Sequence, residues 1–244
     1  MRIRLTVAYD GTAYSGFQCQ INAHAIQDVL NEAVSDLFGQ EIRTIGASRT
    51  DAGVHARGNV AVFDADTRIA PGKIAYALNA RLPEDIRIVC SEEVSPDFHP
   101  RYTDSEKTYT YRIFNRRMPD PLLRLYTLHY YYPLDAEKMD LAASFLIGEH
   151  DFASFCAAGF SGKSTVRTIL RSDVVKEGDL LTYTVTGNGF LYNMVRIIAG
   201  TLIRIGGSSE DPAEMLRILE ARDRNLAGDT ALAKGLTLEE IRYL

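Results

Sequence analysis

The chain has 244 residues, of which 46% are hydrophobic, and a formal net charge of −5 at pH 7. This apolar content supplies a substantial core, arranged as one large domain or two small ones. Three widely separated cysteines without metal-ligand spacing argue against a disulfide framework and a zinc site. The N-terminus has no signal-peptide pattern, and no apolar run approaches membrane-spanning length. We therefore expect a soluble cytoplasmic protein.

The first hundred residues predict the order strand, helix, strand, strand, helix, strand. Alternating apolar residues predict the first strand over 3–9, and an apolar stripe from Ile26 to Leu37 predicts a helix that ends at Gly39. The remaining predicted elements are strands at 42–45, 60–63 and 86–90 and a helix at 71–79. This order is that of ferredoxin-like folds, which many RNA-binding domains share.

The second half predicts a related layout. The predicted elements are strands at 109–113 and 126–132, a helix capped by Asp135, a hairpin of 167–176 with 180–187, a helix at 191–205, a helix beginning at Asp211-Pro212, and a strand at 236–238. We therefore expect an α+β fold of two ferredoxin-like or RRM-like halves, residues 1–102 and 103–244. Their antiparallel sheets are expected to meet at a central catalytic cleft.

One ten-residue segment, Gly46 to His55, carries the clearest chemical signal. It reads Gly-Ala-Ser-Arg-Thr-Asp-Ala-Gly-Val-His and places Asp51 in a turn bracketed by glycines. Arg49 would share a face with Asp51 in an extended chain, so an anionic nucleophile would lie beside a cation that can hold an anion. Taken alone, an Arg-x-Asp turn is more often an ordinary solvated loop.

The segment 49–55 resembles the catalytic motif of the tRNA pseudouridine synthase A family. Further resemblances span almost the whole chain: Tyr9-Asp10-Gly11-Thr12, Gly16-Phe17-Gln18, Asn79 with Leu82-Pro83, Phe98-His99 with Arg101, Lys107 to Tyr111, Asp151-Phe152 with Ser154-Phe155, Gly189 to Arg196, and Ala233 with Gly235-Leu236. Two positions depart from the family pattern. Phe17 stands where tryptophan is more usual, and Ser48 stands where glycine often precedes the motif arginine.

The resemblance implies a cofactor-free, metal-free isomerase that converts uridines at positions 38–40, in the anticodon stem-loop of tRNA, to pseudouridine. It implies tRNA as the partner and a homodimer as the assembly. Asp51 matches the nucleophile and Arg196 the arginine that pairs with it. Tyr109 matches the tyrosine that lies against the target base, and Arg49 would grip a phosphate or hold the flipped-out nucleotide.

Several alternatives remain open on the residues alone. Helical periodicity equally allows Arg196 to face water, and Tyr111 lies on the same strand face as Tyr109. His55, His99 and His150 are interpreted as structural or RNA-contacting. A non-catalytic RNA-binding protein or folding helper is the alternative function. A carboxylate-nucleophile phosphatase is weakly supported, because a second acid and metal ligands are missing around Asp51.

The negative net charge argues against an RNA partner, because phosphates require Lys and Arg. The basic residues are nevertheless concentrated in two segments, Arg101, Lys107, Arg112, Arg116, Arg117 and Arg124 in one and Lys163, Arg167 and Arg171 in the other. We therefore predict a basic groove on an acidic body.

Overall fold

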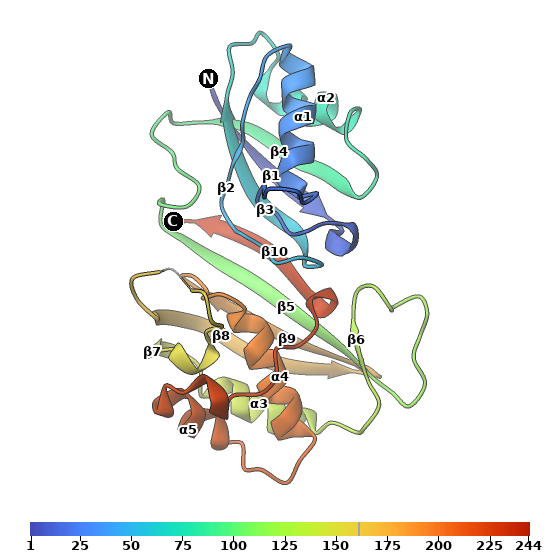
Figure 1. The fold of residues 1–244 in the computed structure, drawn as a ribbon, viewed down its shortest axis with the longest axis vertical. Helices are drawn as coiled ribbons and strands as arrows, with labels where there is room; N and C mark the ends of the chain where they lie inside the picture. Colours follow the sequence, from blue (N-terminus) through green and yellow to red (C-terminus); the bar gives the residue numbers. More distant parts are fainter. Residues whose placement is uncertain (161) are drawn as a thin grey trace. The chain divides into compact units, whose positions relative to one another are not determined.

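The computed structural model describes residues 1–160 and 162–244. The chain divides into two compact units, unit 1 with Met1–Ser105 and Leu238–Leu244, and unit 2 with Glu106–Thr237. Both contain helices and β-strands, so the protein is α+β (Figure 1). The sequence placed the division between residues 102 and 103 and assigned the C-terminal residues to the second half. In the structure Leu238–Leu244 pack with unit 1 instead.

Unit 1 consists of a sheet with two helices. Its elements are β1 (Arg2–Tyr9), η1 (Gly11–Ala13), α1 (Ile26–Phe38), β2 (Ile45–Gly46), β3 (His55–Asp64), α2 (Pro71–Asn79) and β4 (Ile86–Val94), joined by most of β10 (Leu236–Tyr243). The strand order is β4-β1-β3-β10, with β2 also paired to β3. β1 is antiparallel to both β3 and β4.

The first strand and first helix of unit 1 form as their patterns predict. Ile3, Leu5 and Val7 are buried while their neighbours are partly exposed, because successive strand side chains point to opposite faces. α1 ends at Gly39, whose φ of 66° is left-handed and therefore suits a glycine at a helix C-terminus. α2 has the predicted bounds and begins with Pro71 at a first-turn position.

The strand expected at 42–45 is wrong in its extent, because β2 contains only Ile45–Gly46. Side chains of α1 hold the preceding backbone instead. The Ile42 amide donates to Ser35 Oγ at 3.0 Å, and the Thr44 amide donates to Asn31 Oδ1 at 2.8 Å. Backbone groups satisfied by side chains need no strand partner.

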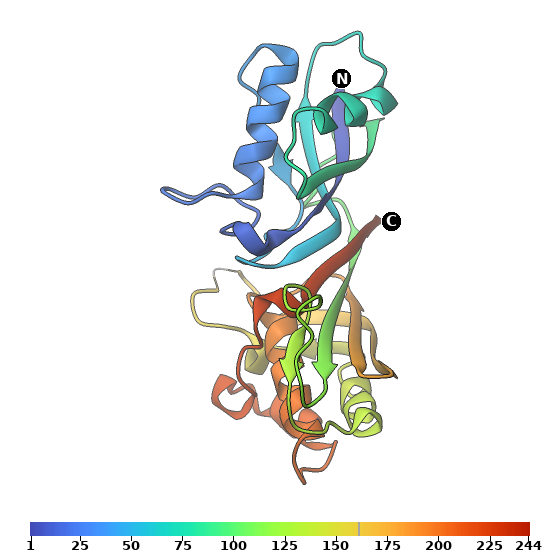
Figure 2. The ribbon, with the colours of Figure 1, turned by 90° about the vertical axis from the view of Figure 1, so that its right-hand side faces the viewer.

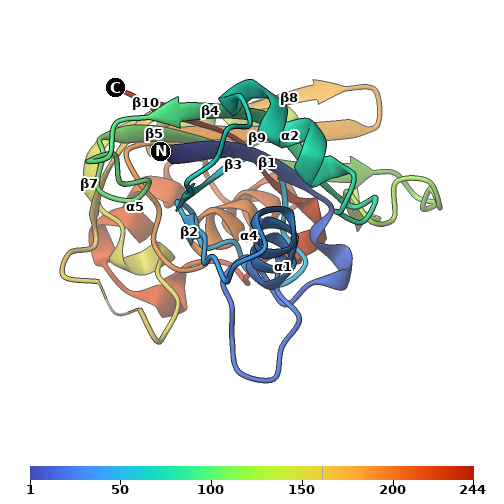
Figure 3. The same cartoon turned by 90° about the horizontal axis from the view of Figure 1, so that it is seen from above.

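The segment between η1 and α1 projects from unit 1 as an open loop (Figures 2 and 3). An isolated β-bridge joins Gln20 and Ala23 across the loop. Asn22 takes a positive φ of 61° at the turn between them. Ile21 at the tip is 92% exposed. The loop leaves the unit directly after Phe17, which is buried.

The strands of unit 2 run in the order β5-β9-β8-β7, with β6 paired to β5. Its elements are β5 (Ser105–Asn115), β6 (Leu128–Tyr130), α3 (Ala136–Ser144), β7 (Gly148–Asp151), η2 (Ala153–Phe155), β8 (Val166–Glu177), β9 (Leu180–Gly187), α4 (Met194–Gly206), α5 (Glu214–Ala221), η3 (Arg224–Leu226) and η4 (Ala233–Gly235), with the start of β10. α3 packs on both β8 and α4. The β8–β9 hairpin turns at Gly178, whose φ is 60°.

Three expectations for unit 2 need correction. β6 is shorter than 126–132 and runs parallel to β5, whereas antiparallel sheets were expected. The helix expected at 191–205 begins at Met194, because Asn193 has a left-handed φ of 59° that a helix interior does not allow. The helix expected from Asp211-Pro212 begins at Glu214 after a turn.

One strand was missed by the sequence patterns, and several others extend beyond their expected bounds. β7 was not predicted, because Gly-Glu-His-Asp has no alternating apolar residues to mark it. β10 continues to Tyr243, well beyond the expected end at residue 238. Its later residues are partly exposed or charged, so hydrophobicity alone gives no sign of the extension.

Candidate active site

The predicted nucleophile lies on the segment from the last residue of β2 to the residue before β3, here called the Asp51 loop (residues 46–54). Asp51 is half-buried, while Arg49 is exposed. The Ala47 amide donates to the Val60 carbonyl at 2.8 Å, and the Val54 amide donates to the Asp51 carbonyl at 3.1 Å. The second of these bonds closes a tight turn at Asp51, as the sequence predicted.

A buried polar network holds the first half of the Asp51 loop. Asn59 on β3 is 0% exposed, and its amide nitrogen donates to the Tyr9 hydroxyl at 3.1 Å and to the Ser48 carbonyl at 3.2 Å. Its Oδ1 accepts from the Ser48 amide at 3.3 Å. The Tyr9 hydroxyl lies 2.7 Å from Thr50 Oγ1. Two strands thus fix the residue immediately before Asp51.

The segment after β1 supports the loop from the other side. The Phe17 amide donates to the Thr50 carbonyl at 3.1 Å, and the Gly53 amide donates to the Tyr14 carbonyl at 3.3 Å. Gly16 has a φ of 93°, and a Cβ there would lie 2.6 Å from the Thr50 carbonyl oxygen. Only glycine permits this approach, so the Gly16-Phe17 motif has a mechanical role in placing Asp51.

His55, at the end of the loop, is buried. Its Nδ1 accepts a hydrogen bond from the Gly11 amide at 3.1 Å and lies 3.1 Å from Asp10 Oδ1. These contacts tie the first residue of β3 to the turn after β1. The sequence left His55 as either structural or RNA-contacting, and its burial and partners fit the structural role.

The other two histidines considered in the sequence analysis, His99 and His150, also bond to nearby backbone. His99 Nδ1 accepts from the Arg101 amide at 3.2 Å, and its ring stacks on Tyr102 with centroids 4.2 Å apart. His150 Nε2 lies 3.0 Å from the Ile147 carbonyl oxygen. Both therefore shape local turns.

Arg196 lies on α4 of unit 2 and does not simply face water. It is half-buried, with Nε donating to the Ala231 carbonyl at 2.8 Å and Nη1 donating to Asn193 Oδ1 at 2.8 Å. The Ala231 amide in turn donates to the Arg196 carbonyl at 3.1 Å. Both donors are thus held in place, and the pairing of Arg196 with Asp51 stays a prediction.

Both candidate tyrosines of β5 are buried. Tyr111 is 0% exposed, and its hydroxyl donates to the Leu232 carbonyl at 2.8 Å. Burial raises its pKa, so the phenol stays protonated. Tyr109 packs edge-on against Phe190, with centroids 5.1 Å apart and an interplanar angle of 82°. Tyr109 is 8% exposed, so burial does not separate the two tyrosines, and the choice of Tyr109 stays a prediction from the family motif.

Comparison with known proteins identifies the chain's relatives. A profile described as tRNA pseudouridine synthase matches residues 5–103 and 142–244. The chain is 46% identical over 241 residues to tRNA pseudouridine synthase A of Thermoanaerobacter sp. (strain X514), covering 99% of each protein. The chain belongs to this family. The corresponding proteins of Brevibacillus brevis (strain 47 / JCM 6285 / NBRC 100599) and Streptococcus pneumoniae (strain P1031) are 46% and 43% identical, over 99% of this chain and 99% and 98% of theirs.

Family membership confirms the recognition made from the motif at 49–55. The chain is thus a tRNA pseudouridine synthase, an isomerase, and the predicted enzyme class and tRNA-modification activity are those of the family. Arg49 and Asp51 lie in the first matched segment and Arg196 in the second. Tyr109 lies between the two segments, so its assignment depends on the motif Lys107 to Tyr111 and on its packing.

Sequence reasoning missed the residues that hold the Asp51 loop. Asn59 was not singled out, although an amide in the otherwise apolar run Asn-Val-Ala-Val-Phe was a usable signal. Tyr9 was quoted only as part of the first motif. Arg101 was named among the basic residues and in the motif with Phe98-His99, but not as a support of the loop, and its Nε donates to the Gly46 carbonyl at 2.7 Å.

Several arginines of the predicted basic groove already have partners. Arg116 lies 3.7 Å from Asp179, and Arg171 pairs with Asp173. The Arg117 guanidinium lies 5.9 Å from the centre of the Tyr131 ring. These contacts reduce the positive charge available to a phosphate, so the groove remains a prediction.

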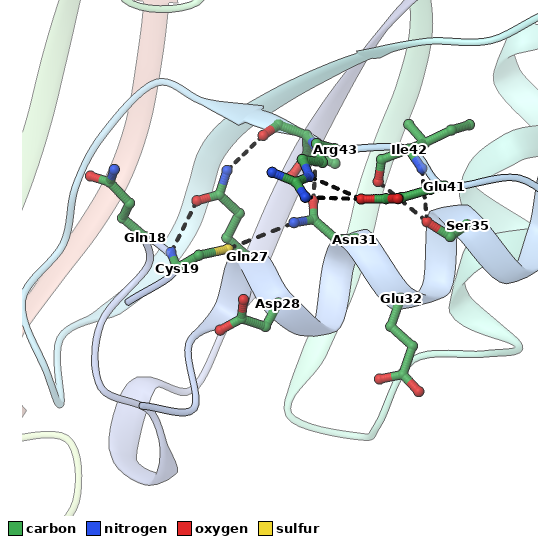
Figure 4. Close-up of a pocket in the computed structure, with 11 residues that line it drawn as sticks. Gln18, Cys19, Gln27, Asp28, Asn31, Glu32, Ser35, Glu41, Ile42 and Arg43 are labelled. Carbon is green, nitrogen blue, oxygen red and sulfur yellow. Dashed lines mark hydrogen bonds and ion pairs between the residues drawn. The ribbon is translucent and has the colours of Figure 1, made fainter. Parts of the chain in front are cut away.

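A cavity of about 480 Å³ in unit 1 is a second feature, separate from the Asp51 loop (Figure 4). It lies along α1 and contains none of Arg49, Asp51, Tyr109 or Arg196. Asp28, Glu32 and Glu41 line it, and Arg43 is already paired with Glu41 at 3.0 Å. A pocket with this charge repels phosphate, so it is a poor RNA site.

Neither a metal site nor a membrane span is found within residues 1–160 and 162–244. No three His, Cys, Asp or Glu side chains of that part gather as a metal site would require. None of its helices combines the length and apolarity needed to cross a bilayer.

Proposed function

We propose that this chain isomerises uridine to pseudouridine in the anticodon stem-loop of tRNA, at positions 38–40, with Asp51 as the nucleophile. The observation that supports this most directly is the Asp51 loop. A family-matched carboxylate lies on a turn whose neighbours, Thr50 and Gly53, are held by hydrogen bonds from other segments. Such preorganisation favours a group that must meet a reacting atom.

The reaction breaks the C1′–N1 bond of uridine, forms a C1′–C5 bond, removes the proton from C5 and adds a proton to N1. Bonds and electrons balance without an oxidant or an energy source. A carboxylate can bond to the nucleotide transiently and leave again, which divides one difficult step into easier ones. Attack at C1′, attack at C6, and elimination to a glycal are three routes open to Asp51.

The remaining roles follow the family motif. In this proposal Arg196 is the cation that pairs with the Asp51 carboxylate and Tyr109 lies against the target base. Stacking returns about 1–3 kcal/mol per base, against a cost of a few kcal/mol for flipping a nucleotide out. Because these energies are comparable, further contacts are needed, and Arg49 supplies one to the RNA backbone or the flipped nucleotide.

The architecture and assembly belong to the same proposal. We infer two ferredoxin-like halves whose sheets meet at the catalytic cleft, a homodimer that binds tRNA, and a cytoplasmic location. The strand order β4-β1-β3 with β2 on β3 supports the ferredoxin-like assignment of unit 1. Cofactor-free chemistry is part of the proposal, because an isomerisation needs no redox partner.

Asp51→Asn tests the proposal directly, since the amide cannot act as the nucleophile. We expect the variant to lose tritium release from tRNA transcripts carrying C5-labelled uridine, while retaining tRNA binding. Asp66→Asn is the matched control, because Asp66 is an exposed acid of the same unit. Replacing one of the uridines at positions 38, 39 and 40 by cytidine should remove the tritium release that comes from that position and leave release from the other two unchanged. Full turnover by Asp51→Asn would refute the assignment.

The alternative is a non-catalytic RNA-binding protein or folding helper built on the same domains. It predicts no pseudouridine from the wild-type protein and equal binding by wild type and Asp51→Asn. Mapping pseudouridine by chemical derivatisation in tRNA from cells that lack the protein separates the two functions. Loss of pseudouridine in the anticodon stem-loop supports the isomerase.

A further inference from the structure

Two arginines of unit 1 flank the start of the Asp51 loop. Arg49 lies within the loop and is exposed, whereas Arg101 comes from the segment after β4 and is half-buried. Arg101 Nε donates to the Gly46 carbonyl at 2.7 Å, so its guanidinium is tied to the first residue of the loop. The two η nitrogens of Arg101 keep their donor capacity beside the segment that carries Asp51.

These two arginines repel one another. Burial lowers the pKa of Arg101, and the positive charge of Arg49 lowers it further. Within residues 1–160 and 162–244, no carboxylate forms an ion pair with either side chain. The chain has 32 acidic and 27 basic residues. Acidic residues are therefore in excess overall, yet none forms an ion pair with Arg49 or Arg101 in the part of the chain that the structure describes.

Other arginines of unit 1 behave differently. Arg2 pairs with Asp64 at 2.7 Å, Arg4 with Glu92 at 2.7 Å, and Arg81 with Asp36 at 2.6 Å. Taking a cation partly out of water is unfavourable without an anion to compensate. Two like charges at one place, one of them half-buried, therefore indicate an anionic ligand that arrives from outside.

We propose that Arg101 and Arg49 together bind one backbone phosphate of the RNA substrate, next to the nucleotide presented to Asp51. The inference rests on the proposed function and adds Arg101 to it as a binding residue. A guanidinium presents paired donors that match phosphate oxygens. Because Gly46 holds Arg101, the phosphate would set the position of the RNA backbone relative to the Asp51 loop.

The first experiment measures binding of a fluorescently labelled, unmodified anticodon stem-loop RNA over a series of salt concentrations. Arg101→Gln should weaken binding about tenfold, the loss of one charged hydrogen-bonded contact. It should also reduce the slope of log K against log salt by roughly 0.7–0.9, the value for one phosphate. Arg49→Gln should act similarly. Arg68→Gln, at an exposed arginine of the same unit, should change neither.

Arg101→Lys separates this role from a purely structural one. It keeps the charge but loses the paired geometry, so the salt slope should be retained while affinity falls. If thermal unfolding shows that Arg101→Gln does not fold, Arg101→Lys replaces it as the test variant. Unchanged affinity and slope in a folded Arg101→Gln would overturn the proposal.

A second experiment locates the phosphate. Stem-loop RNAs carrying one neutral methylphosphonate each should show one position where the wild type loses about tenfold in affinity and Arg101→Gln loses nothing further. Equal losses for both proteins at every position would also overturn the proposal. Tritium release by the wild type is measured in parallel. Absence of release would contradict the proposed isomerase activity, whereas the binding measurements alone test the phosphate site.

Discussion

The hydroxyl of Tyr9 on β1 lies 2.7 Å from Thr50 Oγ1, one residue before Asp51. Tyr9→Phe removes this hydroxyl and leaves both Thr50 and the buried Asn59 amide with one partner fewer. We expect a loss of about 1–3 kcal/mol of unfolding free energy. We also expect a fall in kcat with little change in KM, because the carboxylate is held less well while the RNA contacts remain.

Tyr183→Phe is the control for Tyr9→Phe. Tyr183 is buried in unit 2, and its hydroxyl lies 3.2 Å from Ser172 Oγ. This variant should lose stability without the kcat effect. Equal kcat losses in the two variants would show that general destabilisation, rather than positioning of Asp51, lowers the rate.

Ser48 carries a buried hydroxyl with no hydrogen-bond partner among the described residues. Ser48→Ala removes this unsatisfied group and leaves the backbone contacts with Asn59 in place. The variant should be about 1 kcal/mol more stable, because the cost of burying the hydroxyl is recovered. Calorimetric thermal unfolding measures the change.

Ser154→Ala should change stability in the opposite direction. Ser154 Oγ is buried and donates to the Ile218 carbonyl at 2.6 Å, so its removal leaves that carbonyl unpaired. We expect a loss of about 1–3 kcal/mol. The same shift in both serine variants would contradict the assignment of an unpaired hydroxyl at Ser48.

Gly16 and Gly39 both have positive φ, at 93° and 66°, but different surroundings. A Cβ at Gly39 meets nothing within 4 Å, so Gly39→Ala should cost only the backbone strain of about 1–2 kcal/mol. A Cβ at Gly16 would lie 2.6 Å from the Thr50 carbonyl oxygen. Gly16→Ala should therefore cost more stability and also lower turnover, since it displaces the residue before Asp51. Tritium release and thermal unfolding of both variants check this, and equal effects would argue against a role for Gly16 in the loop.

Cys19 in the cavity along α1 should alkylate slowly. Burial, and then the hydrogen bond and charge of Asp28, raise its pKa to about 11. A raised pKa keeps the thiol protonated, so at pH 8 only about one molecule in a thousand carries the reactive thiolate. Iodoacetamide should label the exposed Cys90 first, and Cys19 labelling should continue to accelerate as the pH rises toward 11.

Asp28→Asn is the matched change for Cys19. It removes the negative charge while retaining the size of the side chain, so the Cys19 pKa should fall and labelling at pH 8 should accelerate. Mass spectrometry of the labelled peptides measures both thiols. Rapid labelling of wild-type Cys19 at pH 8 would contradict the raised pKa.

Much of the secondary structure follows from local patterns. α2 matches its predicted bounds, and α1 ends at the predicted Gly39. Asp135 caps α3 through the Lys138 amide at 3.0 Å. These features depend on neighbours in sequence, which periodicity and capping chemistry record. β6 and β7 were misjudged, because strand pairing depends on residues far away in the chain.

The sequence by itself determined the family and the candidate nucleophile, since the motif at 49–55 and the order of the other motifs are contained in residue identity alone. The tertiary structure decided which side chains are buried and which groups hold them. It placed Tyr111 in the core, held the Arg196 guanidinium on Ala231 and Asn193, and revealed Asn59 and Arg101 as supports of the Asp51 loop. A local pattern can mark a polar residue such as Asn59 as unusual, but its hydrogen-bond partners come from segments that meet only in the folded chain, so the pattern could not name them.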